Sequence, residues 1–307
     1  QSQKDTGALG VRMIDGGGNF LKESKRSFPF PSTAFYKLSG LAALFPASET
    51  FARYYLGQLD QYKNHEVGVL AGAYMMVDKK VLDKTGGFDE RFFMYGEDID
   101  LSFRIQNAGF KNIYFSEATI IHFKGESTKR GSLNYVRLFY GAMGLFVRKH
   151  YNRGFAKLYN LLIRMAIWVR GLISMGHSVT GLLGYRKEDF KETDCFVVAG
   201  KAQFDFISSV FQKNKTEQKI IGRINPGFSV EKDAIGNLQQ LALLAGKQNI
   251  KEIIFGVDGF PAKEMITLMQ ELPKGMHFKF HFAGTFSIVG SNQRELQGDY
   301  MSIDGVG

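Results

Sequence analysis

The sequence has little of what marks a disulfide-stabilised or membrane-spanning protein. Its 307 residues include one cysteine, Cys195, so no disulfide can form within the chain. No run of 18 apolar residues occurs, so no segment has the pattern of a membrane-spanning helix. A single cysteine fits a reducing compartment, and we therefore expect a cytoplasmic protein.

Acidic residues are missing from one part of the chain. Residues 131–187 contain nine Lys and Arg but no Asp or Glu, and they carry most of the net charge of +9. Apolar side chains recur there at helical spacing. This pattern is typical of a helix lying in an anionic membrane surface, but also of a helical arm packed on a neighbouring domain. We do not expect nucleic acid as a partner, because no nucleic-acid-binding motif accompanies the charge.

The pattern of strands and helices divides the chain into three parts. We expect a mixed α/β domain over residues 1–130, a basic amphipathic helical segment over 131–193, and a smaller α/β domain over 194–307. In the last part, strands alternate with helices at the spacing of a Rossmann-like parallel sheet. Its first strand-to-helix turn lacks the G-x-G-x-x-G fingerprint of dinucleotide binding, which favours a structural or protein-docking role over a nucleotide site.

Local signals predict several elements of the first part. Asp78 is a typical N-cap for a short helix that ends at Gly86, and a second helix is closed by Gly109. Strands are expected at the apolar runs. These are residues 7–14, 67–70, 73–77, 112–115 and 118–122.

The densest cluster of charge lies at residues 86–101, where five acids stand among aromatic side chains. They are Asp89, Glu90, Glu97, Asp98 and Asp100. Carboxylates are costly to bury without partners, so this segment indicates a cleft that handles protons, cations or sugar hydroxyls. The alternative is a solvated acidic turn, since Glu97, Asp98 and Asp100 also favour the start of a helix.

Four segments, in this order and spacing, resemble the motifs of family 2 glycosyltransferases with the GT-A fold, the rhamnosyltransferase-like branch in particular. They are LAGAYMMV at 70–77, GFDERFF at 87–93, GEDIDLSFR at 96–104 and IHFKGES at 121–127. The resemblance implies an α/β fold class, in which residues 1–130 form the C-terminal portion of a GT-A fold. Residues 194–307 resemble the Rossmann-like domain appended to Bacteroidetes family 2 glycosyltransferases.

The resemblance also implies an activity and a site. We expect an inverting transfer of a sugar from a nucleotide sugar to a saccharide or polyprenol-linked acceptor, in bacterial surface polysaccharide synthesis at the inner face of the cytoplasmic membrane. Asp98 would be the base, and Asp100 would pair with Arg104 one helical turn later. The other implied site residues are Glu97, Gly72, Ala73, Ser127 and Lys129 for substrate, and His122 for a divalent cation, Mg²⁺ or Mn²⁺.

One family feature is missing. No Asp-x-Asp metal motif precedes Gly7, so we expect the nucleotide-binding part of the enzyme to be absent and this chain to be inactive alone. Two other interpretations remain open. One is a non-catalytic interaction protein that docks a protein partner through residues 194–307, and the other is a nucleotide-sensing regulator built on the same residues.

Overall fold

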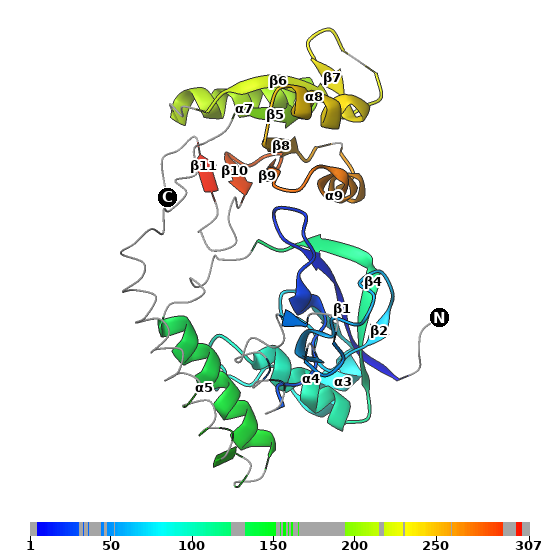
Figure 1. Ribbon diagram of the computed structural model, residues 1–307, viewed down its shortest axis with the longest axis vertical. Helices are drawn as coiled ribbons and strands as arrows, with labels where there is room; N and C mark the ends of the chain where they lie inside the picture. The colour runs from blue at the N-terminus through cyan, green and yellow to red at the C-terminus, as the bar shows by residue number, and fades with distance from the viewer. Residues whose placement is uncertain are drawn as a thin grey trace. The chain divides into compact units, whose positions relative to one another are not determined.

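The computed structural model describes most of the chain. The described residues are 5–30, 33, 36, 44–45, 48–51, 53–123, 133–151, 154, 156–157, 159, 161, 165, 194–214, 218–229, 231–258, 260–290 and 299–302. They form two compact units. Residues 1–13, 20–120 and 130–187 belong to the first unit, and residues 14–19, 121–129 and 188–307 to the second. The fold class is mixed α/β, as the sequence predicts (Figure 1).

The first unit is built on a four-stranded sheet. Its strands are β1 (Thr6–Ile14), β2 (His65–Glu66), β3 (Met75–Val77) and β4 (Lys111–Ile121), in the order β2-β4-β1-β3. Its described residues form the helices α3 (Lys79–Thr85), α4 (Glu97–Asn107) and α5 (Leu133–His150), with short 3₁₀ turns at Lys22–Ser24 and Arg53–Tyr55. Strands β1 and β3 are antiparallel, as are β2 and β4.

The predicted helix boundaries of this unit are confirmed. The Asp78 carboxylate accepts a hydrogen bond from the Lys80 amide, which satisfies one of the unpaired donors at the start of α3. Gly86 ends that helix with a φ of 74°. Helix α4 begins after Gly96, and Gly109 follows its end, with φ values of 88° and 90° that favour glycine over any other residue.

Residues 112–115 and 118–121 are strand as predicted, but the predicted break between these runs is wrong, and so is the strand predicted at 67–70. Residues 112–115 and 118–122 are not separate strands, because β4 runs unbroken through Ser116 and Glu117. The Ser116 amide donates to the Asn64 side chain in an exposed hydrogen bond of 2.7 Å. This hydrogen bond satisfies the backbone at the polar residues, where the sequence pattern predicts a break. Residues 67–70 form no strand, since Val69 makes a single antiparallel bridge with Arg26.

Helix α5 packs its apolar side on the first unit. Met143, Phe146 and Val147 are buried in one cluster with Phe92 and Ile99. For this helix, the interpretation as a packed arm therefore holds rather than the membrane-surface one. Most of the second predicted apolar stripe, at 158–173, lies outside the described residues. Among the helices that the structure describes, none has the length and apolarity needed to cross a membrane.

The second unit contains a seven-stranded sheet in the order β11-β10-β9-β8-β5-β6-β7. The strands are β5 (Cys195–Val198), β6 (Ile220–Asn225), β7 (Gly236–Asn237), β8 (Glu252–Gly256), β9 (His277–His281), β10 (Ser287–Gly290) and β11 (Asp299–Ser302). Along the sheet, the five neighbouring strands β9, β8, β5, β6 and β7 are parallel, which confirms the predicted parallel sheet. Strands β10 and β11 add an antiparallel edge that the sequence pattern did not indicate.

Three helices cover the two faces of this sheet. They are α7 (Lys201–Asn214), α8 (Leu241–Lys247, preceded by a 3₁₀ turn at Leu238–Gln240) and α9 (Ala262–Glu271). Side chains of α8 and α9 share one buried cluster with alternate residues of β5, β8 and β9. The remaining residues of β5 pack with α7 on the opposite face. Every residue of β5 is buried, as expected for a strand covered on both sides.

The two left-handed glycines that flank α4 give a matched stability test. A Cβ at Gly96 would lie 3.2 Å from the Phe92 ring and 3.3 Å from Met143, whereas one at Gly109 would contact nothing. We expect Gly109→Ala to lower the free energy of unfolding by about 1–2 kcal/mol for backbone strain alone. Gly96→Ala should lose about 1 kcal/mol more through overpacking. Urea denaturation measures both, and equal losses would contradict the contact at Gly96.

Candidate active site

Three carboxylates occupy the first turn of α4, where the exposed amides of the helix N-terminus favour negative charge. They have different surroundings. Asp100 is completely buried, and the Asp98 side chain is 14% exposed. Glu97 is partly buried. Neighbouring residues on one helical turn thus have separate environments.

Asp98 is held by three hydrogen-bond donors. Its Oδ2 atom accepts from Arg26 Nη2 at 2.5 Å and from the Gly72 amide at 3.2 Å. Its Oδ1 atom accepts from the Ile99 amide at 2.8 Å. These contacts fix the carboxylate against the exposed backbone of Gly72 and Ala73, so the structure brings together two segments that the sequence assigns to the site.

Arg26 is the residue of this site that sequence reasoning missed. It is 8% exposed, and its backbone forms the bridge to Val69 while Nη2 also donates to the Leu70 carbonyl at 3.0 Å. Burial lowers the pKa of Arg26, but the charge of Asp98 and a hydrogen bond with Tyr54 more than offset this, so its pKa lies above the ordinary value. Arg26 and Asp98 are 72 positions apart, and no local pattern links them.

Glu97 is the least satisfied acid of the turn. Its Oε2 atom is buried and has no hydrogen-bond partner among the described residues. Burial raises the pKa of Glu97, and the negative charge of Asp98 raises it further. A buried carboxylate oxygen without a donor has an unused capacity to bind a hydroxyl group.

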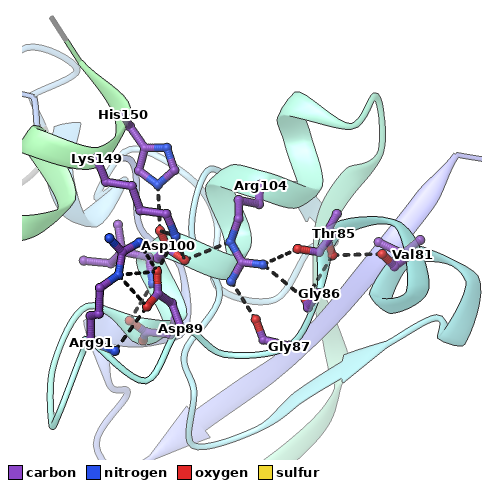
Figure 2. A network of polar contacts seen from close by, with 12 residues as sticks. Val81, Thr85, Gly86, Gly87, Asp89, Arg91, Asp100, Arg104, Lys149 and His150 are labelled. Carbon is purple, nitrogen blue, oxygen red and sulfur yellow. Dashed lines mark hydrogen bonds and ion pairs between the residues drawn. The ribbon is translucent and has the colours of Figure 1, made fainter.

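Asp100 is the centre of a polar network that joins α4 to α5 (Figure 2). Arg104 Nε donates to its Oδ2 at 2.8 Å, which confirms the predicted pairing within the helix. Lys149 Nζ lies 2.7 Å and His150 Nε2 lies 2.6 Å from Oδ1, both reaching from the end of α5. Burial raises the pKa of Asp100, but these hydrogen bonds outweigh it and hold the pKa below its ordinary value.

The same network holds the loop between α3 and α4. The Arg104 guanidinium donates to the carbonyls of Thr85 and Gly86, and to that of Gly87 at 2.7 Å (Figure 2). Lys149 also pairs with Asp89 at 2.7 Å. Hydrogen bonds from Arg91 and then Lys149 keep the pKa of Asp89 well below its usual range. The loop between α3 and α4, which contains Gly86 and Gly87, is therefore held to α4 by Arg104 and to α5 by Lys149.

The other predicted site residues are His122, Ser127 and Lys129. His122 belongs to the second unit, where its amide donates to the Ile14 carbonyl. Ser127 and Lys129 lie outside the described residues. Within the part of the chain that the structure describes, no three His, Cys, Asp or Glu side chains come together as a metal site. The predicted divalent cation thus has no complete ligand set among these residues.

The second unit offers its own candidate site at the carboxyl ends of its parallel strands. Strands β5 and β8 meet where the chain order along the sheet reverses, the usual binding crevice of such folds. The Gln203 amide from the first turn of α7 fills this position, lying against Gly256 and donating to His281 Nδ1 at 2.9 Å. Lys201, at the start of α7, pairs with Asp205 and Asp233, so this lysine already has acidic partners.

A buried carboxylate with several partners should be sensitive to neutralisation. Asp100→Asn leaves Arg104 and Lys149 without their shared counter-ion, and we expect a loss of about 3–5 kcal/mol in the free energy of unfolding at pH 7. Because the pKa of Asp100 is lowered on folding, the loss should shrink as the pH falls below about 4. Asp83→Asn breaks an exposed pair of the same helical spacing and should cost no more than about 0.5 kcal/mol. Urea denaturation across pH distinguishes these outcomes, and equal losses would contradict the network.

Comparison with known proteins identifies the family of the chain. The family model described as "Glycosyl transferase family group 2" matches residues 33–188. Two N-acetylglucosaminyl-diphospho-decaprenol L-rhamnosyltransferases, from the CDC 1551 / Oshkosh and H37Rv strains of Mycobacterium tuberculosis, are each 36% identical over 81 residues. That match covers 26% of this chain and 26% of each relative, so it spans about a quarter of their length. No solved structure matches at a significant level. The chain belongs to glycosyl transferase family group 2.

Proposed function

We propose that the protein is an inverting glycosyltransferase that moves a sugar from a nucleotide sugar to a saccharide or lipid-linked saccharide. The observation that carries the proposal is the fixed Asp98 carboxylate beside the exposed Gly72 loop, at the start of α4. A transferase of this kind needs a base within reach of the acceptor hydroxyl and a way to stabilise the departing diphosphate. Membership of glycosyl transferase family group 2 supports sugar transfer as the reaction that such a base would serve.

In the proposed reaction, Asp98 acts as the general base. It accepts the proton of the acceptor hydroxyl while that oxygen forms a bond to the anomeric carbon of the donor. The bond from this carbon to the diphosphate oxygen breaks, and its electron pair leaves with the nucleoside diphosphate. One displacement inverts the anomeric centre. General base catalysis of this kind contributes about 100- to 10,000-fold to a rate.

Other residues of the turn would bind substrate. Glu97 has a buried oxygen without a partner among the described residues, which suits a hydrogen bond from an acceptor hydroxyl. Gly72 and Ala73 are exposed next to Asp98, and Gly72 leaves room because a Cβ there would lie 3.4 Å from Asp98 Cβ. We assign Ser127 and Lys129 to substrate binding on the family resemblance alone.

The proposed substrates follow the relatives. Their names describe transfer of L-rhamnose to N-acetylglucosaminyl-diphospho-decaprenol, and we propose a hexosyl or rhamnosyl transfer to a polyprenol-linked saccharide in surface polysaccharide synthesis. Such an acceptor lies in the cytoplasmic membrane, so we propose peripheral association with its inner face. Lys149 and His150 already bind Asp100, which leaves the other basic residues of 131–187 as candidates for contact with anionic lipid.

Neutralising the proposed base tests the function. In the full-length protein, with a nucleotide-activated L-rhamnose and an N-acetylglucosaminyl-diphospho-polyprenol as probes, Asp98→Asn should lower kcat about 100-fold or more. Donor binding, followed by calorimetry, should stay within about twofold because the base is not expected to bind the diphosphate. Asp83→Asn serves as the matched control, because it changes an exposed aspartate of α3. Turnover of Asp98→Asn at the wild-type rate would refute the assignment, and absence of transfer by the full-length wild type would favour an interaction protein.

A divalent cation is a further part of the proposal. Mn²⁺ accepts imidazole and Mg²⁺ prefers oxygen ligands, so His122 is a chemically suitable ligand for Mn²⁺. A single imidazole does not form a metal site, and the described residues supply no cluster of three ligands. We therefore draw no catalytic step through the metal ion.

The His122 assignment has its own test. We expect His122→Ala to weaken Mn²⁺-dependent donor binding about tenfold, while binding without the metal stays unchanged. His65→Ala removes another imidazole, one that contacts the Asp60 carbonyl, and should leave the titration as in the wild type. Isothermal titration with and without Mn²⁺ measures both. An unchanged metal titration in His122→Ala would remove this residue from the site.

A further inference from the structure

The geometry around Asp98 assigns a role to Arg26 that the sequence motifs do not include. We propose that Arg26 is the positioning residue of the base: it anchors Asp98 Oδ2 and leaves Oδ1 as the atom that receives the acceptor proton. This inference rests on the proposed function, in which Asp98 is the base. It adds which oxygen reacts and which residue holds the carboxylate in place.

The hydrogen bonds of Asp98 distinguish its two oxygens. A carboxylate offers about four lone-pair positions, two on each oxygen. Oδ2 accepts from both Arg26 and the Gly72 amide, so its two positions are filled. Oδ1 accepts from the Ile99 amide and retains one position among the described contacts. The acceptor hydroxyl can therefore donate to Oδ1 without displacing the anchoring contacts.

Arg26 also fixes the backbone that contacts the other oxygen, Oδ2. Its own backbone exchanges hydrogen bonds with Val69, at 2.8 and 3.2 Å, and its guanidinium donates to the next carbonyl, that of Leu70. Gly72 follows two residues later and donates to Asp98. The buried side chain of Arg26 thus sets the position of the Gly72 backbone relative to the Asp98 carboxylate. Such fixed geometry reduces the reorganisation needed when the hydroxyl approaches.

The charge of Arg26 has one carboxylate partner among the described contacts, Asp98. Both side chains are largely buried, at 10% and 14% exposure, so solvent screens the pair weakly. A buried guanidinium stabilises the ionised carboxylate, which is the form that accepts a proton. In the transfer step, the hydroxyl proton moves to Oδ1 while the new bond forms at the anomeric carbon. Arg26 itself gains and loses no proton, because a guanidinium stays charged.

The test compares three variants of the full-length protein through kcat and the KM for the donor. Arg26→Gln removes the anchor of Oδ2, and we expect kcat to fall about tenfold or more while the donor KM stays within about twofold. Arg26→Lys keeps a cation but loses the planar geometry, so it should recover part of the lost kcat. Lys25→Met is the matched control, because Lys25 is an adjacent buried cation that donates to the Leu56 carbonyl instead of Asp98.

A measurement without turnover separates this proposal from the proposed function. The Gly72 amide donates to Asp98, so its hydrogen should exchange with solvent faster in Arg26→Gln than in the wild type. Thermal unfolding checks that each variant is folded. An unchanged kcat and an unchanged Gly72 exchange rate in folded Arg26→Gln would overturn the role of Arg26. If the exchange rate rises but Asp98→Asn retains full turnover, Arg26 positions Asp98 and the base assignment fails.

Discussion

The first unit depends on one buried negative charge. Asp100 is fully enclosed, and its carboxylate binds Arg104 from its own helix together with Lys149 and His150 from the end of α5. Burying a carboxylate is unfavourable unless its oxygens are paired, so α4 and the end of α5 are constrained to meet at this point. Arg104 extends the constraint to the carbonyls of the glycine-rich loop. The first turn of α4, with Glu97 and Asp98, is oriented by this network.

The three acids in the first turn of α4 differ in their burial and in their hydrogen-bond partners. Asp100 is satisfied by cations and has a pKa below its ordinary value, so it remains ionised and serves as an anchor. Glu97, three positions earlier, is short of donors and has a raised pKa, which suits contact with a substrate hydroxyl. Asp98 lies between them and is clamped from the opposite side by Arg26. Acids that look equivalent in the sequence therefore differ in role because of their partners.

Sequence reasoning succeeded where the cause was local. The caps at Asp78 and Gly86, the glycine after α4 and the pairing of Asp100 with Arg104 all depend on neighbours within a few residues. It failed where distant segments meet. Nothing near Arg26 indicates a partner 72 positions away, and the contact of Lys149 with Asp100 spans 49 positions. The apolar stripe of α5 was compatible with a membrane surface or a protein core, and only packing against Phe92 and Ile99 decided between them.

Stereochemistry tests the proposed direct displacement most directly. The product formed from a nucleotide-activated L-rhamnose of known configuration can be followed by nuclear magnetic resonance, using the one-bond carbon–proton coupling at its anomeric carbon. A base at Asp98 that activates the acceptor for one displacement predicts a product with the opposite anomeric configuration to the donor. A product that keeps the donor configuration would contradict this chemistry, because retention requires a second displacement or a different reaction path.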